Sequence, residues 1–93
     1  MRMTIVKEDN LVIIDNYPIT FDLTPFLLPK TFWAMQWYED FGEEEYLDRN
    51  EIIHNLYPYQ PIIDEYKRLK ELIDNQPGPK PYPGTDPGVD EDV

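Results

Sequence analysis

The sequence has no cysteine, a single histidine and no known catalytic motif, and each absence excludes a kind of chemistry. Without cysteine the chain can form no disulfide, no zinc–thiolate site and no thiol nucleophile. His54 alone cannot build a histidine-rich metal site, so we expect it in a turn or at the surface. We therefore expect no enzymatic activity, no catalytic residue, no cofactor and no metal site.

Basic residues are also scarce, with 8 Lys and Arg against 19 Asp and Glu and a formal net charge of −11. Affinity for phosphate groups comes mainly from Lys and Arg, so we expect no direct binding to nucleic acid and none to anionic membranes. One interpretation of the charge is solubility, because high net charge keeps proteins dispersed. The other is an acidic surface that binds a basic partner, in the extreme as a mimic of nucleic acid.

Long apolar runs are missing as well. No run approaches the ~20 residues that a membrane-spanning helix needs, and residues 1–9 lack the apolar stretch of a signal peptide. Residues 76–93, in contrast, hold five of the ten prolines and three of the four glycines. Such a composition builds no core. The sequence thus predicts one small domain over residues 1–75 and an extended or disordered tail over residues 76–93.

Within that domain the first part predicts an antiparallel sheet. Five runs of β-forming residues are separated by polar, turn-forming residues: 3–7, 11–14, 17–23, 31–38 and 43–47. A shorter apolar element follows at 52–53. In the turn before the fifth run we expect Gly42 to take a positive φ, which glycine does without steric cost. Short polar breaks between consecutive runs are typical of a β-meander.

The last element of the predicted domain is an α-helix that begins near residues 57–60 and ends at about Asn75. Apolar residues recur there at spacings of three and four: Tyr59, Ile62, Ile63, Tyr66, Leu69 and Ile73. Pro61 suits the first turn, where its missing N–H has no partner to lose. The predicted fold class is α+β, with an N-terminal antiparallel β-meander of four to five strands packed by one C-terminal helix, then a Pro/Gly-rich extended tail.

Both tryptophans lie in the fourth run, and their spacing predicts a core position. Strand alternation places Trp33, Met35 and Trp37 on one face, which we expect to anchor the sheet under the helix. Gln36 and Tyr38 fall on the other face, which tolerates water better.

Carboxylates cluster in and after the fifth run, at Glu43, Glu44, Glu45 and Asp48. Paired carboxylates can perform acid–base chemistry where an apolar pocket separates their pKa values. The simpler interpretation is an exposed strand whose charge resists aggregation.

The aromatic residues exceed what a sheet and one helix can easily bury, and tyrosine and tryptophan are favoured at the centres of protein contacts. We therefore predict a protein-binding surface, in an oligomer or in a complex with another protein. Its candidate residues are Gln36, Tyr38, Phe41, Glu43, Glu45, Tyr46 and, in the tail, Tyr82.

Three short motifs precede the predicted helix: MQWY at 35–38, GEEEY at 42–46 and NEII at 50–53. With these motifs and the helix, residues 3–74 resemble a family of small proteins encoded by tailed bacteriophages. Members of that family are described as tail or tail-fibre assembly proteins, so the resemblance implies a non-enzymatic role in the virion or in its assembly. It implies a location in the virion or the host cytoplasm, and a phage or host protein as partner. An acidic anti-defence inhibitor that binds a basic host protein is the alternative.

Overall fold

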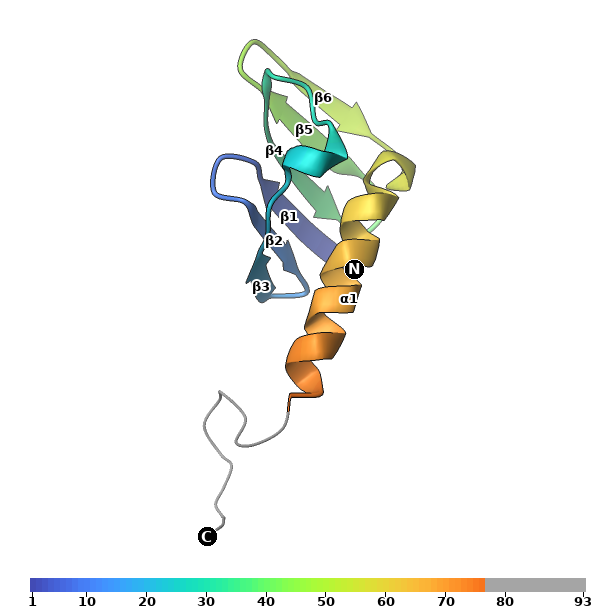
Figure 1. The fold of residues 1–93 in the computed structure, drawn as a ribbon. Helices are drawn as coiled ribbons and strands as arrows, with labels where there is room; N and C mark the ends of the chain where they lie inside the picture. The colour runs from blue at the N-terminus through green and yellow to red at the C-terminus, as the bar shows by residue number, and fades with distance from the viewer. Residues whose placement is uncertain (77–93) are drawn as a thin grey trace, which may run out of the picture.

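The computed structural model describes residues 1–76, which form a single antiparallel sheet with one long helix beside it (Figure 1). The strands are β1 (Arg2–Val6), β2 (Leu11–Ile14), β3 (Tyr17–Thr20), β4 (Phe32–Tyr38), β5 (Gly42–Tyr46) and β6 (Asn50–Ile53). The helices are the short 3-10 turns η1 (Thr24–Phe26) and η2 (Tyr57–Tyr59) and the α-helix α1 (Gln60–Asp74). The predicted tail lies outside the described residues, apart from Gln76.

The strand order is β3-β2-β1-β4-β5-β6, and every neighbouring pair is antiparallel. Two three-stranded meanders are thus joined side by side through β1 and β4, after the chain returns from the β3 edge through η1. The predicted α+β class, with an antiparallel sheet and a C-terminal helix, is confirmed. The sheet has one strand more than predicted, because the short apolar element after the β5 turn pairs with β5 over four residues.

The helix follows its sequence pattern closely. It begins directly after η2 with Pro61 in its first turn, and the N–H of Asn75 closes its end by donating to the carbonyl of Glu71 at 3.0 Å. Its stripe of Ile62, Ile63 and Tyr66 is buried against the sheet. The Tyr66 hydroxyl donates to the Tyr17 carbonyl at 2.7 Å, which ties the helix to edge strand β3.

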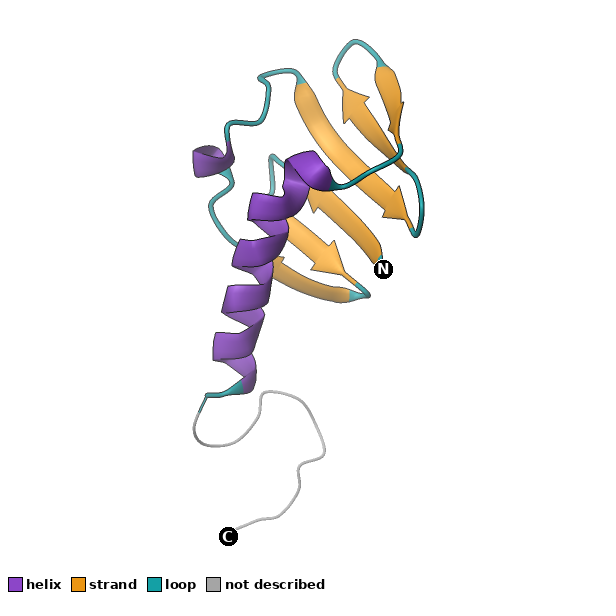
Figure 2. Cartoon of the chain, turned by 90° about the vertical axis from the view of Figure 1, so that its right-hand side faces the viewer, coloured by secondary structure: helices purple, strands orange, loops and turns teal. Residues whose placement is uncertain are grey.

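The helix lies along one face of the sheet (Figure 2). The core consists of buried side chains from that face of the sheet, from the helix and from the segments that join them. The buried core side chains are Met3, Ile5, Val12, Ile14, Ile19, Leu23, Phe32, Met35, Trp37, Tyr59, Ile62, Ile63 and Tyr66. Among residues 1–76, no helix lies over the opposite face of the sheet. A sheet with one covered and one uncovered face is ordinary for antiparallel strands.

The prediction for Trp33 is wrong. The register of β4 against β5 shifts between Phe32 and Ala34, so Trp33 is an extra residue in β4 and the alternation reverses across it. Phe32 therefore joins Met35 and Trp37 on the helix side and is buried, whereas Trp33 is 43 % exposed. Only one of the two tryptophans, Trp37, anchors the sheet under the helix.

Gly42 is also needed for a different reason than predicted. In the turn that joins β4 to β5, the residue with positive φ is Glu39, at 91°. Gly42 is buried, and a Cβ atom there would lie 2.7 Å from the carbonyl oxygen of Gln36 and 2.8 Å from the indole of Trp37. Glycine serves close packing at this position.

Candidate functional site

The uncovered face of the sheet is the candidate site, and strand register places its side chains in rows that cross all six strands. One row, from β3 to β6, contains Pro18, Ile13, Thr4, Gln36, Glu43 and Ile52. The next row contains Thr20, Leu11, Val6, Ala34, Glu45 and Asn50. The β1–β2 half is therefore mainly aliphatic, and the β5 strip is acidic. We call this surface the open face.

Four of the predicted binding residues meet on the open face. Gln36 and Glu43 are direct cross-strand neighbours, Glu45 lies in the adjacent row, and Tyr38 follows at the end of β4. Phe41, in the turn, is 40 % exposed, and its ring centroid lies 5.3 Å from that of Tyr38. The structure thus places five of the predicted binding residues on one continuous surface.

Hydrogen bonds and a cation fix several of these side chains. The Thr4 hydroxyl donates to the Gln36 side-chain oxygen at 2.8 Å, and the Asn50 amide donates to Glu43 at 2.9 Å. The guanidinium of Arg2 lies 5.4 Å from the centre of the Tyr38 ring, within the range of a cation–π contact. Side chains held in this way lose less conformational freedom when a partner binds.

Tyr46 lies on the opposite side of the sheet from these five residues. Its ring packs edge-on against Phe32, with centroids 5.9 Å apart, and its hydroxyl donates to Glu44 at 2.9 Å. The buried Tyr59 of η2 donates to the other oxygen of the same carboxylate at 2.5 Å. Glu44 therefore links β5 to the segment that starts the helix.

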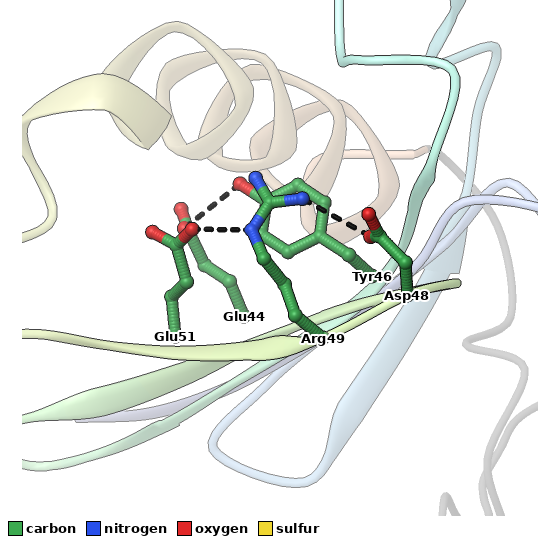
Figure 3. Close-up of polar contacts among 5 residues, drawn as sticks. All are labelled: Glu44, Tyr46, Asp48, Arg49 and Glu51. Atoms are coloured by element: carbon green, nitrogen blue, oxygen red, sulfur yellow. Dashed lines mark hydrogen bonds and ion pairs between the residues drawn. The ribbon is translucent and has the colours of Figure 1, made fainter.

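Arg49, in the β5–β6 turn, lies beside Tyr46 and Glu44, as Figure 3 shows. It bonds to Glu51 at 2.5 Å and to Asp48 at 3.0 Å, and its guanidinium lies 4.2 Å from the centre of the Tyr46 ring. Burial, together with the Glu44 carboxylate, raises the pKa of Tyr46 to about 12. A tyrosine with this pKa stays protonated near neutral pH and serves as a hydrogen-bond donor. The arrangement is that of a structural link between strand and helix.

This link predicts a loss of stability in alkali. Burial first, and then the Glu44 carboxylate, raise the pKa of Tyr59 well above its ordinary value. The stabilisation from the Tyr59 hydrogen bond is fully present well below about pH 10, where Tyr59 is protonated in both the folded and the unfolded state. Above that pH only the unfolded chain releases this proton, so Tyr59 by itself should lower the free energy of unfolding by up to about 1.4 kcal/mol per pH unit, in addition to the effect of the raised pKa of Tyr46. Urea unfolding at pH 8, 10 and 11 measures this.

The matched pair for the alkaline test is Tyr59→Phe against Tyr57→Phe. Tyr57 lies in the same 3-10 turn and is 86 % exposed, so Tyr57→Phe controls for the change of side chain. Tyr59→Phe should make the fall of stability above about pH 10 shallower than Tyr57→Phe does. Identical slopes for these two variants would show that Tyr59 does not keep its proton in the folded state.

Sequence reasoning missed the aliphatic half of the open face, at Val6, Leu11 and Ile13, and Ile52 near its other edge. Leu11 and Ile13 alternate with the buried Val12 and Ile14, but the continuous apolar run gave no sign of which pair faces outward. Ile52 is 56 % exposed.

Exposed Trp33 lines an open pocket of about 310 Å³ at one end of the sheet, together with Lys7, Glu8, Lys30, Phe32 and Leu47. The pocket joins an exposed indole and Leu47, which is 73 % exposed, to two lysines in a chain with few basic residues. None of the predicted binding residues within residues 1–76 lines it, although Tyr46 packs against its wall at Phe32.

Three further observations complete the description of residues 1–76. No group of three or more His, Asp or Glu side chains in this part of the chain is arranged to hold a metal ion. Its helices are too short or too polar to cross a membrane. Tyr82, the remaining predicted binding residue, lies outside the described residues.

In comparisons with known proteins, no family model, no curated protein and no solved structure matches this chain. The geometry of the open face and the sequence resemblance are thus the observations from which a function can be argued.

Proposed function

We propose that this chain is a non-enzymatic bacteriophage protein that acts through protein–protein contacts made by the open face. Its role would be that of a small tail or virion component or of a tail-fibre assembly chaperone. The observation that carries the contact surface is the one-sided sheet: five predicted binding residues lie together on the face that α1 leaves uncovered.

The composition of this face fits a protein partner. Tyr38 and Phe41 form an aromatic pair at one end of this face, and Val6, Leu11 and Ile13 of β1 and β2 add aliphatic side chains further along it. Aromatic anchors within an apolar centre and a polar rim are the usual anatomy of protein interfaces. The resemblance of 35–38, 42–46 and 50–53 to small tailed-phage proteins supplies the setting, and all three motifs have residues on this face.

A second candidate function is an acidic inhibitor of a basic host protein, including a mimic of nucleic acid. The observation in its favour is charge: Glu43 and Glu45 point from β5 to the open face, in a chain of net charge −11. Binding of this kind is weakened by salt, because exposed charges are screened at high ionic strength.

Site-specific photo-cross-linking tests the proposed surface and separates the two roles. A benzophenone amino acid replaces Gln36 on the open face or, as the control, Lys67, which is exposed on α1. After irradiation during phage growth in the host, mass spectrometry identifies the adducts. We expect a discrete adduct from position 36 and none from position 67.

The identity of the adduct distinguishes the roles. A tail or fibre protein supports the virion or assembly role. A basic host protein whose binding to the purified chain is lost at about 0.5 M salt supports the inhibitor, since the Debye length is then only a few ångströms. The same adducts from both positions, or none from position 36, would contradict the open face as the contact surface.

A further inference from the structure

The two free edges of the sheet differ in their capacity to accept another strand. On β3, Ile14 and Tyr17 close a two-residue turn, and the N–H of Phe21 donates to the carbonyl of Asn10 at 2.9 Å. Hydrogen-bonded and non-hydrogen-bonded pairs alternate along antiparallel strands. The backbone of Pro18 therefore points away from β2, to the free edge, and proline has no N–H to offer there. This edge is blocked at its centre.

The β6 edge carries no such block. The N–H of Tyr46 donates to the carbonyl of Arg49 at 2.8 Å, which starts the β5–β6 ladder. By the same alternation, Glu51 and Ile53 bond inward to β5, whereas the N–H and C=O groups of Asn50 and Ile52 point outward. Asn50, Glu51 and Ile52 are all exposed, so within residues 1–76 nothing covers this edge.

The side chains around the β6 edge define the chemistry of a strand that could pair with it. Residues 42–53 carry five carboxylates and one basic residue, Arg49, a net charge of −4. Ile52, 56 % exposed, stands on the open face beside the edge, and Glu51 stands on the helix side. An added strand would place alternate side chains next to Ile52 and next to Glu51. Apolar residues suit the first position and Lys or Arg the second.

We propose that the free edge of β6 pairs with an extended, basic segment of the partner, through main-chain hydrogen bonds at Asn50 and Ile52. This inference rests on the proposed function and gives the partner a chemical character: a strand in which apolar and basic residues alternate. The carboxylates that attract it also repel a second copy of this chain, whose β6 would bring the same charges to the same edge.

The test uses a synthetic nine-residue peptide of alternating lysine and valine, with an alternating glutamate–valine peptide as the control. On addition of the lysine peptide we expect slowed hydrogen exchange at the amides of Asn50 and Ile52, measured by NMR. The glutamate peptide should protect neither amide. Binding of the lysine peptide without protection at these two amides would overturn the inference, because it would show attraction by charge alone.

Proline substitutions provide an independent test of pairing at the β6 edge. Ile52→Pro removes an outward N–H and leaves the bonds from β6 to β5 in place, so affinity for the lysine peptide should fall by about tenfold or more. Thr20→Pro, which also points outward but on the β3 edge, should leave affinity unchanged. Equal affinities for the two variants would refute edge pairing. If Ile52→Pro fails to fold, the exchange measurement on the unmodified chain decides.

Ile52→Pro, tested in the cross-linking experiment, also distinguishes a failure of edge pairing from a failure of the proposed function. If Ile52→Pro still gives the position-36 adduct at full yield while Tyr38→Ala abolishes it, the open face is the binding surface and the edge is not. If neither substitution changes the adduct, both proposals fail.

Discussion

Replacing Trp37 by alanine should lower the free energy of unfolding by about 3–5 kcal/mol, the usual cost of deleting a large aromatic side chain from a core. The indole is 7 % exposed and packs in the core with Met35, and its N–H donates to the Glu39 carbonyl at 3.0 Å, which closes the β4–β5 turn. Small domains have total stabilities of only about 5–15 kcal/mol. A large share of the variant should therefore be unfolded under mild conditions, as measured by urea titration followed by circular dichroism.

Trp33→Ala is the matched control, because it removes the same side chain from the same strand. Trp33 is 43 % exposed, so its loss should cost only about 1 kcal/mol or less. Equal destabilisation by the two substitutions would contradict the β-bulge that places the tryptophans in different environments.

Replacing Gly42 by alanine should be almost as damaging, although it adds a single methyl group. That methyl carbon would lie 2.7 Å from the backbone oxygen of Gln36 and 2.8 Å from a ring carbon of Trp37. Backbone cannot give way as a flexible side chain can, so β5 would have to move from β4. Overpacking of this kind costs about 1–3 kcal/mol and occasionally more, and we expect the upper end of that range.

Thermal and urea unfolding of Gly42→Ala measure this effect, with Asp40→Ala as the control. Asp40 is exposed in the same turn, so its replacement should change the free energy of unfolding by about 0.5 kcal/mol or less. If Gly42→Ala were as stable as the unmodified chain, the close contact between β4 and β5 at this point would be wrong.

The elements with a strong local pattern were predictable from the sequence. Six apolar residues at helical spacing run from Tyr59, directly before the helix, to Ile73, with Pro61 in the first turn and Asn75 just after the end, so all these signals lie in one short continuous segment. The β2–β3 turn is similar: Asp15 and Asn16 both take positive φ, a conformation that Asn and Asp tolerate and that two-residue hairpins require.

The features that depend on pairing between distant residues could not be derived in the same way. The bulge at Trp33 exists because β4 must match β5, which is contributed by residues 42–46. The strand order is also non-local, since β1 pairs with β4 after an intervening hairpin and η1. No window of sequence contains both partners.

For the candidate site, strand alternation explains why most of the predicted binding residues share the open face and why Tyr46 does not. Glu43 and Glu45 are two residues apart in one strand, so they share a face, as do Gln36 and Tyr38. Tyr46 is one residue from Glu45, and the same period of two places it on the other side with Glu44. Sequence reasoning could have separated Tyr46 from the binding residues. The apolar Met35 and Trp37 and the more polar Gln36 and Tyr38 did indicate which face of β4 lies under the helix, whereas the continuous apolar run at 11–14 gave no such sign for β2.

The measurement that tests the open face most directly is the yield of the photo-cross-linked adduct from position 36, with and without Tyr38→Ala. Tyr38 lies beside this position at the aromatic end of the face, and its ring packs at a tilt against that of Phe41, while α1 lies on the other side of the sheet. We predict a strong adduct from position 36, its loss in the Tyr38→Ala background, and no adduct from Lys67. An adduct of equal yield from position 67, or one from position 36 that is insensitive to Tyr38→Ala, would contradict binding through the open face.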